Sequence, residues 1–234
     1  MFELKTPTGR RMPLVWRWSS SPYKVYLGAA HGVCGILLVL LQCPQPTWDA
    51  YEEVLLETVD CLIDFQLASG NWPSSVGSPS DDLVQWCHGA PGMVLLLSLL
   101  VGRHEPEFAL SAARRETYLR ALSAGARCVW ERGLLIKGPP NLCHGTAGSA
   151  YALLHASIAT DDCELLAQGM SIAMHAANWR ELERGGQLVR GDSPSSLMCG
   201  VAGAACLWAD LLCVVCGQRE NFVGFPASLD IAQS

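Results

Sequence analysis

The tripeptide Cys-His-Gly occurs twice in the sequence, at Cys87-His88-Gly89 and at Cys143-His144-Gly145. Two thiolates and one imidazole form a ligand set that favours zinc among the common metals. Three protein ligands leave one tetrahedral position open, which is typical of a catalytic rather than a structural site. For a single pair, a buried thiol beside a satisfied histidine would be the simpler interpretation. The spacing is not that of a zinc finger, but two pairs in register favour a metal site containing both cysteines and one histidine.

Both tripeptides belong to a longer repeat with the pattern His/Cys-Gly-x-x-Gly. Its four copies begin at His31, His88, His144 and Cys199, and their first glycines are 57, 56 and 55 residues apart. A long and nearly constant period indicates a repeat architecture. Paired glycines let neighbouring backbones approach closely, which explains the glycines but not the histidine or cysteine before them.

Apolar and amphipathic stretches alternate around these motifs. The apolar stretches after the motifs indicate buried inner helices, at 36–41, 93–101, 150–158 and 204–215. The longer amphipathic stretches indicate outer helices with one solvated face, at 51–67, 118–130 and 163–179. Loops rich in Pro, Gly, Ser and Asp precede the motifs, and no sustained period-two alternation indicates strands. Such units around an axis predict an all-α protein with an α/α toroid, in which adjacent inner-helix starts bring Cys87 and Cys143 together.

The composition is that of a chain with a large core, since half of its 234 residues are hydrophobic and 16% are charged. A net charge of -6 argues against binding to a phosphate backbone, so we expect no nucleic-acid partner. The apolar runs are shorter than the roughly 20 residues that span a bilayer, and no secretory signal is recognisable. Several of the 11 cysteines lie in apolar helical stretches, which favours reduced thiols and a cytoplasmic protein.

The first 24 residues are locally basic. One interpretation is a solvated terminal arm, and the other is peripheral contact with anionic lipid at the plasma membrane. The basic residues are Lys5, Arg10, Arg11, Arg17 and Lys24.

Around its motifs the sequence resembles the eukaryotic LanC-like proteins, which are relatives of the bacterial lanthionine cyclases. The resemblance runs from about Pro13 to Pro226 and is carried by both Cys-His-Gly motifs and by the segments 26–32, 70–73 and 133–138. It implies an α/α toroid of seven helical hairpins around one zinc ion, of which this chain holds about four. We therefore expect an arm at 1–12, a partial toroid domain at 13–226 and a tail at 227–234.

The resemblance also implies roles for individual residues. One Zn2+ per chain would be bound by Cys87, Cys143 and His144, with His88 beside it at the substrate. Glutathione would be the thiol partner, and dehydroamino-acid residues of peptides or proteins would be the acceptors. The zinc-activated thiolate would add to the β-carbon, forming a thioether. His31 would be the acid/base group that protonates the developing enolate.

Several positions differ from the family pattern. Lys137 corresponds to the glutathione-contacting lysine, but the spacer between it and Cys143 is one residue longer than usual. The arginine of the family's glutathione-contacting loop aligns with Val189, so the adjacent Arg190 is the candidate anion-binding residue. Cys199 replaces a glutamate that is usual in the family, and it can approach the metal. The aspartate proposed as a catalytic group in the cyclases lies upstream of the matched region.

Two other functions stay open from the sequence. The first is a non-catalytic zinc protein that binds glutathione or a protein partner. The second is a glycan-processing α/α barrel, which needs paired carboxylates about 5–10 Å apart. Asp81 and Asp82 are the conspicuous pair near a motif, although a role in a loop or helix cap is the simpler interpretation.

Overall fold

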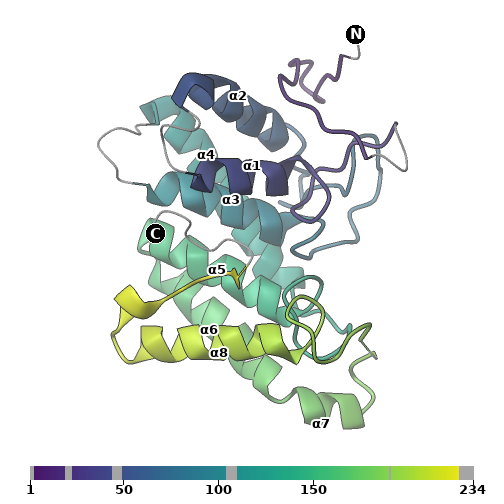
Figure 1. The fold of residues 1–234 in the computed structure, drawn as a ribbon, viewed down its shortest axis with the longest axis vertical. Helices are drawn as coiled ribbons and strands as arrows, with labels where there is room; N and C mark the ends of the chain where they lie inside the picture. Colours follow the sequence, from purple (N-terminus) through teal and green to yellow (C-terminus); the bar gives the residue numbers. More distant parts are fainter. Residues whose placement is uncertain (1–2, 19–22, 44–48, 104–109, 190, 227–234) are drawn as a thin grey trace.

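The computed structural model describes residues 3–18, 23–43, 49–103, 110–189 and 191–226, and these ranges are built of helices without a strand (Figure 1). This confirms the all-α prediction. None of the described helices is both long enough and apolar enough to cross a bilayer. The helices are α1 (Val33–Gln42), α2 (Glu52–Ile63), α3 (Ala90–Gly102), α4 (Ala112–Arg132), α5 (Thr146–Thr160), α6 (Cys163–Ala177), α7 (Trp179–Arg184) and α8 (Val201–Val215), with 3-10 turns η2 (Asp49–Tyr51) and η3 (Arg219–Asn221).

The helices form an inner and an outer layer, as in part of an α/α toroid. The inner helices contact one another in the order α1, α3, α5, α8, while α2, α4 and α6 pack against α1, α3 and α5 from outside. Helices α3 and α5 are buried along most of their length because they have neighbours on several sides. Helix α8, at the end of the row, leaves Leu212 and Val215 exposed. The loops before the inner helices gather at one side of the molecule (Figure 1).

The inner helices begin three to four residues before the predicted apolar stretches. Each starts directly after the first glycine of its motif, so the second glycine lies in the first helical turn. A Cβ atom at Gly148 would lie 2.2 Å from the carbonyl oxygen of Leu142, because the incoming loop crosses the helix start at close range. Gly89 has φ +115°, which a side chain rarely tolerates. The glycines therefore allow the close backbone approach that the pattern predicts.

The outer helices have conventional polar starts. The Ser111 side chain accepts a hydrogen bond from the backbone N–H of Arg114 and begins α4. The Asp162 carboxylate accepts from the N–H groups of Glu164 and Leu165 and begins α6. Helix α7 was not predicted, since it is short, buries no residue and carries no apolar periodicity.

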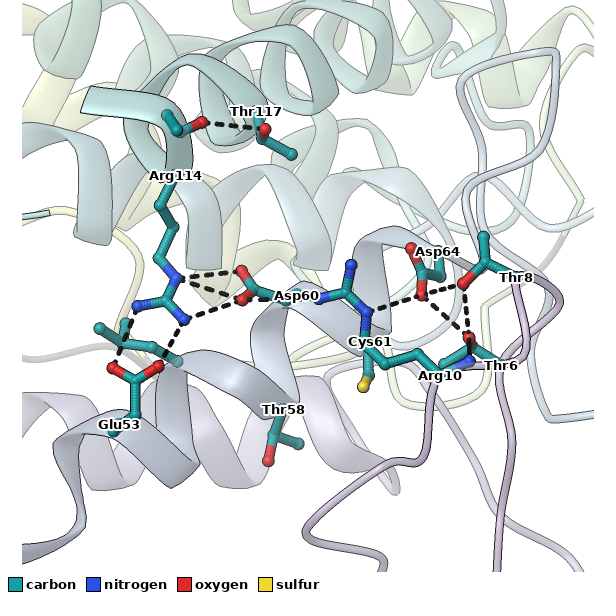
Figure 2. Close-up of polar contacts among 12 residues, drawn as sticks. Thr6, Thr8, Arg10, Glu53, Thr58, Asp60, Cys61, Asp64, Arg114 and Thr117 are labelled. Atoms are coloured by element: carbon teal, nitrogen blue, oxygen red, sulfur yellow. Dashed lines mark hydrogen bonds and ion pairs between the residues drawn. The ribbon is translucent and has the colours of Figure 1, made fainter. Parts of the chain in front are cut away.

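The N-terminal arm packs against α2 through a few residues, while its basic side chains Lys5, Arg10 and Arg11 stay exposed. Arg10 lies 3.4 Å from Asp64 and 3.7 Å from Asp60, and the hydroxyl groups of Thr6 and Thr8 donate to Asp64 Oδ2 at 2.9 and 2.6 Å (Figure 2). Arg10 is half exposed, so its ion pairs are weak and apolar packing contributes more to attachment. The apolar arm residues that are buried are Leu4 and Met12.

A second ion-pair group joins the outer helices α2 and α4. The guanidinium of Arg114 donates to Asp60 and to Glu53, with the shortest distances 2.9 and 2.8 Å (Figure 2). These contacts line an open surface hollow of about 380 Å³ between the arm, α2 and α4. The two arginines and two aspartates that line the hollow neutralise each other's charge, so we interpret these contacts as structural ones that hold the arm, α2 and α4 together.

The segment after α8 folds back across the inner helices (Figure 1). The buried carboxylate of Asp210 accepts hydrogen bonds from the backbone N–H groups of Val223 and Gly224 at 2.9 and 3.0 Å. The backbone N–H of Phe225 donates to His155 Nε2 at 3.0 Å, and its ring stacks on Trp86 with 5.1 Å between centroids. This segment thereby connects α8 and α5 to the residue that precedes Cys87.

Candidate metal centre

Backbone hydrogen bonds connect equivalent positions of the four motifs in a row. The N–H of Ala30 donates to the carbonyl of Cys87 at 3.4 Å, and the N–H of Cys87 donates to the carbonyl of Cys143 at 3.1 Å. The N–H of Cys143 in turn donates to the carbonyl of Met198 at 2.9 Å. Residues that occupy equivalent positions in the sequence repeat are therefore also neighbours in space, and the motifs lie side by side.

This arrangement brings Cys87, Cys143 and His144 together. One ligand atom from each of the three residues lies within 4.8 Å of the other two. Cys87 is buried, and the His144 side chain is 11% exposed, so water has limited access to the group. The residues named from the sequence as metal ligands are thus juxtaposed, in an arrangement that can hold a metal ion.

The two thiols of this group influence each other and ionise unequally. The pKa of Cys87 is lowered because its sulfur accepts a hydrogen bond from Cys143 and from nearby backbone N–H groups. The pKa of Cys143 is raised because it is the donor in that hydrogen bond and is partly buried. Cys87 is therefore the first of the pair to become a thiolate, and a positive ion between them would favour ionisation of both.

The donor set fits zinc. Sulfur and imidazole nitrogen are the usual zinc ligands, and three protein donors leave one tetrahedral position free. Nε2 of His144 is buried and finds no hydrogen-bond partner within the described ranges, its nearest acidic atom being Asp192 Oδ2 at 3.6 Å. A buried nitrogen without a partner is costly unless a ligand satisfies it.

His88 and His31 lie together on the other side of Cys87, in an aromatic group. The centroid of the His88 ring is 5.8 Å from that of His31 and 5.4 Å from that of Tyr26, and Trp18 packs 4.7 Å from His31. Burial lowers the pKa of His88, and the neighbouring His31 and Lys24 lower it further. His31 is exposed. His88 thus lies outside the group of Cys87, Cys143 and His144, which agrees with the role that the family resemblance implied. His88 and His31 lie beside that group.

Lys137 lies beside the group through a salt bridge. Its Nζ is 2.8 Å from Asp192 Oδ2, which raises the pKa of the lysine and lowers that of the aspartate. A β-bridge between Lys137 and Val189 fixes the two loops that carry these residues. The spacer that is one residue longer therefore leaves Lys137 within reach of the His144 side of the group. Arg190, the other predicted anion-binding residue, lies outside the described residues.

The carboxylates of Asp81 and Asp82 have structural partners. Asp81 accepts hydrogen bonds from Asn71 at 2.8 Å and from Arg132 at 3.1 Å, and Asp82 accepts from Ser80 at 2.8 Å. These contacts agree with the loop role and give no support to a pair of glycan-hydrolysing carboxylates.

Two buried asparagines support the site and were not predicted. Asn141 Oδ1 accepts from the N–H of His144 at 2.9 Å, and its Nδ2 donates to the carbonyls of Lys137 and Pro139. Asn71 Oδ1 accepts from the N–H of Ala90 at 2.8 Å, at the start of α3. They stand at different distances before their motifs, so the repeat gave no signal for them. Asn71 lies within the 70–73 segment, which contributes to the family resemblance but gives no indication of this role.

Comparison with known proteins agrees with this geometry. The family model described as lanthionine synthetase C-like protein matches residues 15–216. The chain therefore belongs to the lanthionine synthetase C-like family.

Two relatives of similar sequence show how much of such proteins the chain covers. The glutathione S-transferase LANCL1 of Danio rerio is 34% identical over 201 residues, which are 86% of this chain and 45% of that protein. The LanC-like protein GCL1 of Arabidopsis thaliana is 34% identical over 206 residues, which are 86% of this chain and 43% of that protein. The chain thus spans somewhat less than half the length of these relatives.

Proposed function

We propose that the chain binds one zinc ion through Cys87, Cys143 and His144 and activates glutathione for addition to dehydroamino-acid residues. The observation that carries this proposal is the grouping of two sulfurs and one imidazole within 4.8 Å at adjacent inner-helix starts. The name of the Danio rerio relative, a glutathione S-transferase, supports glutathione as the thiol.

Zinc, when bound, supplies a Lewis acid that keeps a coordinated thiol ionised at neutral pH. In the proposed reaction the sulfur of glutathione forms a bond to the β-carbon of a dehydroalanine or dehydrobutyrine residue. The electron pair of the carbon–carbon double bond moves toward the carbonyl group, and a proton then adds to the α-carbon. The product is a thioether, and no oxidant or reductant is consumed.

His31 is the candidate for that proton transfer. It is exposed, so it can exchange its proton with water, and it lies at the Cys87 side of the metal group next to His88. Burial and nearby positive charge lower the pKa of His88, which makes the neutral form the dominant one at pH 7. We assign His31 the role of acid and His88 that of a neutral hydrogen-bonding neighbour.

Glutathione carries two carboxylates, and Lys137 is a candidate contact for one of them. Its amino group already faces the Asp192 carboxylate at 2.8 Å, and a glutathione carboxylate would compete for the same charge. Because Lys137 and Asp192 are both largely exposed, their salt bridge is weak enough to exchange. Arg190 follows the loop residue Val189, which pairs with Lys137, and is the second candidate.

A polypeptide acceptor is supported by the surface of the loops that precede the inner helices. These loops expose several large apolar side chains, most of them close in sequence to Lys137, Cys199 or the paired Val189. Such residues suit contact with the side chains that flank a modified residue in a protein. The exposed residues are Leu83, Leu134, Ile136, Val189 and Leu197.

The test combines metal analysis with a thiol-addition assay. We expect one zinc per purified chain, and a mass increase of one glutathione on a peptide that contains dehydroalanine. The variant Cys143→Ala should lose both, whereas Cys163→Ala, which removes an exposed thiol of α6, should keep both. Stoichiometric zinc without adduct would contradict the enzymatic role.

A binding role without catalysis is the second candidate, because the chain spans less than half the length of its relatives. Calorimetry separates the two proposals. Glutathione that binds the zinc-loaded chain and never transfers would favour the binding role, and no binding at all would exclude it.

A further inference from the structure

Cys199 is the fourth member of the motif row and is placed next to the metal group by the backbone. It occupies the same motif position as His144, directly before the first glycine. The N–H of Cys143 donates to the carbonyl of Met198 at 2.9 Å, so the residue before Cys199 is fixed against Cys143. The N–H of Cys199 donates to Ser196 Oγ at 3.1 Å, which holds the loop in place.

Cys143 has two cysteine neighbours, since the thiols of both Cys87 and Cys199 influence its ionisation. Cys199 lies outside the compact group of three, whose ligand atoms are all within 4.8 Å of one another. It is partly exposed, whereas Cys87 is buried. Cys199 is therefore a partly accessible thiol beside the three-residue group.

We propose that the Cys199 thiol is a fourth ligand of the metal bound by Cys87, Cys143 and His144 whenever no outside thiol occupies that position. The Cys199 side chain has a single torsion with three staggered positions, so its sulfur has few alternative placements beside Cys143. Three sulfurs and one nitrogen form a complete tetrahedral set of the kind found in closed zinc sites. This inference rests on the metal binding in the proposed function, and it adds that an incoming thiol must displace a ligand of the chain.

Asp192 is the competing candidate for the fourth position. Its Oδ2 atom lies 3.6 Å from His144 Nε2, but the same atom is held by Lys137 at 2.8 Å and the side chain is 60% exposed. A site that already contains two thiolates favours a third soft ligand over a carboxylate. The geometry therefore points to Cys199, and Asp192 becomes one outcome of the test.

The test counts thiolate ligands in cobalt-loaded protein, prepared with a phosphine reductant so that no other thiol is present. Co2+ replaces zinc, and its thiolate charge-transfer absorption increases with the number of bound sulfurs. We expect Cys199→Ala to retain one cobalt per chain but to lose about one third of this absorption, since three thiolates become two. Cys163→Ala is the matched control and should match the wild type, and Asp192→Asn should retain the full charge-transfer band.

A second measurement uses the unaltered chain, so it does not depend on the folding of a variant. Iodoacetamide labelling followed by mass spectrometry gives the reactivity of each cysteine with and without zinc. We expect zinc to protect Cys199 together with Cys143, while Cys163 reacts equally in both states. Adding glutathione to the zinc-loaded chain should restore the reactivity of Cys199 but not that of Cys143.

The outcomes separate this inference from the proposed function. A cobalt spectrum that is the same in wild type and Cys199→Ala, together with Cys199 labelling that zinc does not change, would overturn only the fourth ligand. Altered cobalt bands in Asp192→Asn alone would assign that position to the carboxylate. A chain that binds neither cobalt nor zinc would overturn both.

Discussion

The two Cys-His-Gly tripeptides are identical in sequence but differ in what surrounds them. The first contributes only Cys87 to the metal group, and its histidine faces His31 and Tyr26. The second contributes both Cys143 and His144. Both tripeptides directly precede an inner helix, but the backbone differs at the glycine, where φ is 115° at Gly89 and -122° at Gly145.

The neighbours of each motif explain its role. Each motif cysteine donates its N–H to the next motif in the row, so Cys87 and Cys143 face each other across one repeat boundary. The N–H of His144 is held by Asn141, and two paired loops, one with Lys137 and one with Asp192, meet beside this histidine. The tripeptide alone therefore does not determine which histidine joins the group, because the backbone and the neighbours differ between the two motifs.

The largest expected effect comes from removing either sulfur. Cys87→Ala and Cys143→Ala should each lower zinc affinity by more than about 100-fold, because changes in supporting residues alone cost about 10–100-fold. A chromophoric chelator in competition with the protein measures the affinity. Cys206→Ala, which alters a thiol on α8, is the control and should bind as the wild type does. Retained affinity in both ligand variants would refute the assignment.

The second effect distinguishes the two histidines directly. His144→Ala should weaken zinc binding by about 100-fold, whereas His88→Ala should change it by no more than a few-fold, since supporting contacts carry less than a ligand does. The same competition assay gives both numbers. Equal losses in the two variants would mean that the motifs share the metal symmetrically, contrary to the described geometry.

The third effect compares the two supporting asparagines. Asn141→Ala should lower zinc affinity by about 10-fold or more, because the N–H of His144 loses its acceptor and the ligand its fixed orientation. Asn71→Ala should leave the affinity unchanged and lower the free energy of unfolding by about 2 kcal/mol, since it leaves buried groups at the start of α3 unpaired. Denaturant titration of the metal-free chains measures the second quantity.

The smallest effect is a dependence of stability on pH that comes from His155 in α5, where α3 has a leucine at the equivalent position. Burial lowers the pKa of His155 to about 4 in the folded chain, against about 6.5 in an unfolded one. The unfolded chain therefore binds more protons between these values, and stability falls as the pH decreases through this window. From pH 7 to 5.5 the free energy of unfolding should decrease by about 1 kcal/mol from this group.

The variant His155→Leu provides the matched comparison, since the equivalent residue in α3 is Leu99. His155→Leu loses the acceptor for the Phe225 N–H and should be less stable at neutral pH. Its stability should nevertheless vary less with pH between 7 and 5.5 than that of the wild type. An unchanged pH slope in this variant would assign the dependence to other groups.

Much of the repeat could be predicted from the sequence because it depends on local periodicity. The four inner helices, three outer helices and the meeting of Cys87 with Cys143 all follow from the motif period and the apolar stretches. The early helix starts could not be predicted, since glycine lowers helix propensity and its place in the first turn is decided by a crossing loop. The attachment of Arg10 to α2 likewise depends on contacts between residues 50 and 54 positions apart in sequence.

The supporting residues of the site were the least predictable part. Asn141 and Asn71 look like ordinary loop residues, and only their burial and hydrogen bonds reveal that they hold helix starts. The return of Phe225 onto Trp86 also joins segments that share no sequence pattern. These contacts are set by tertiary packing, which a local pattern does not encode.

The row of backbone bonds through Ala30, Cys87, Cys143 and Met198 has a consequence for variation among such chains. Because the ligand-bearing positions are held across the repeats, the length of the loop that precedes a motif need not be conserved. The extra residue between Lys137 and Cys143 illustrates this freedom. Insertions such as a peptide tag beside Gly77, whose Cα faces open space, should therefore be tolerated, whereas Ser74 and Val76 are bonded to the 25–27 segment. Loop length can in this way diversify specificity while the centre stays constant.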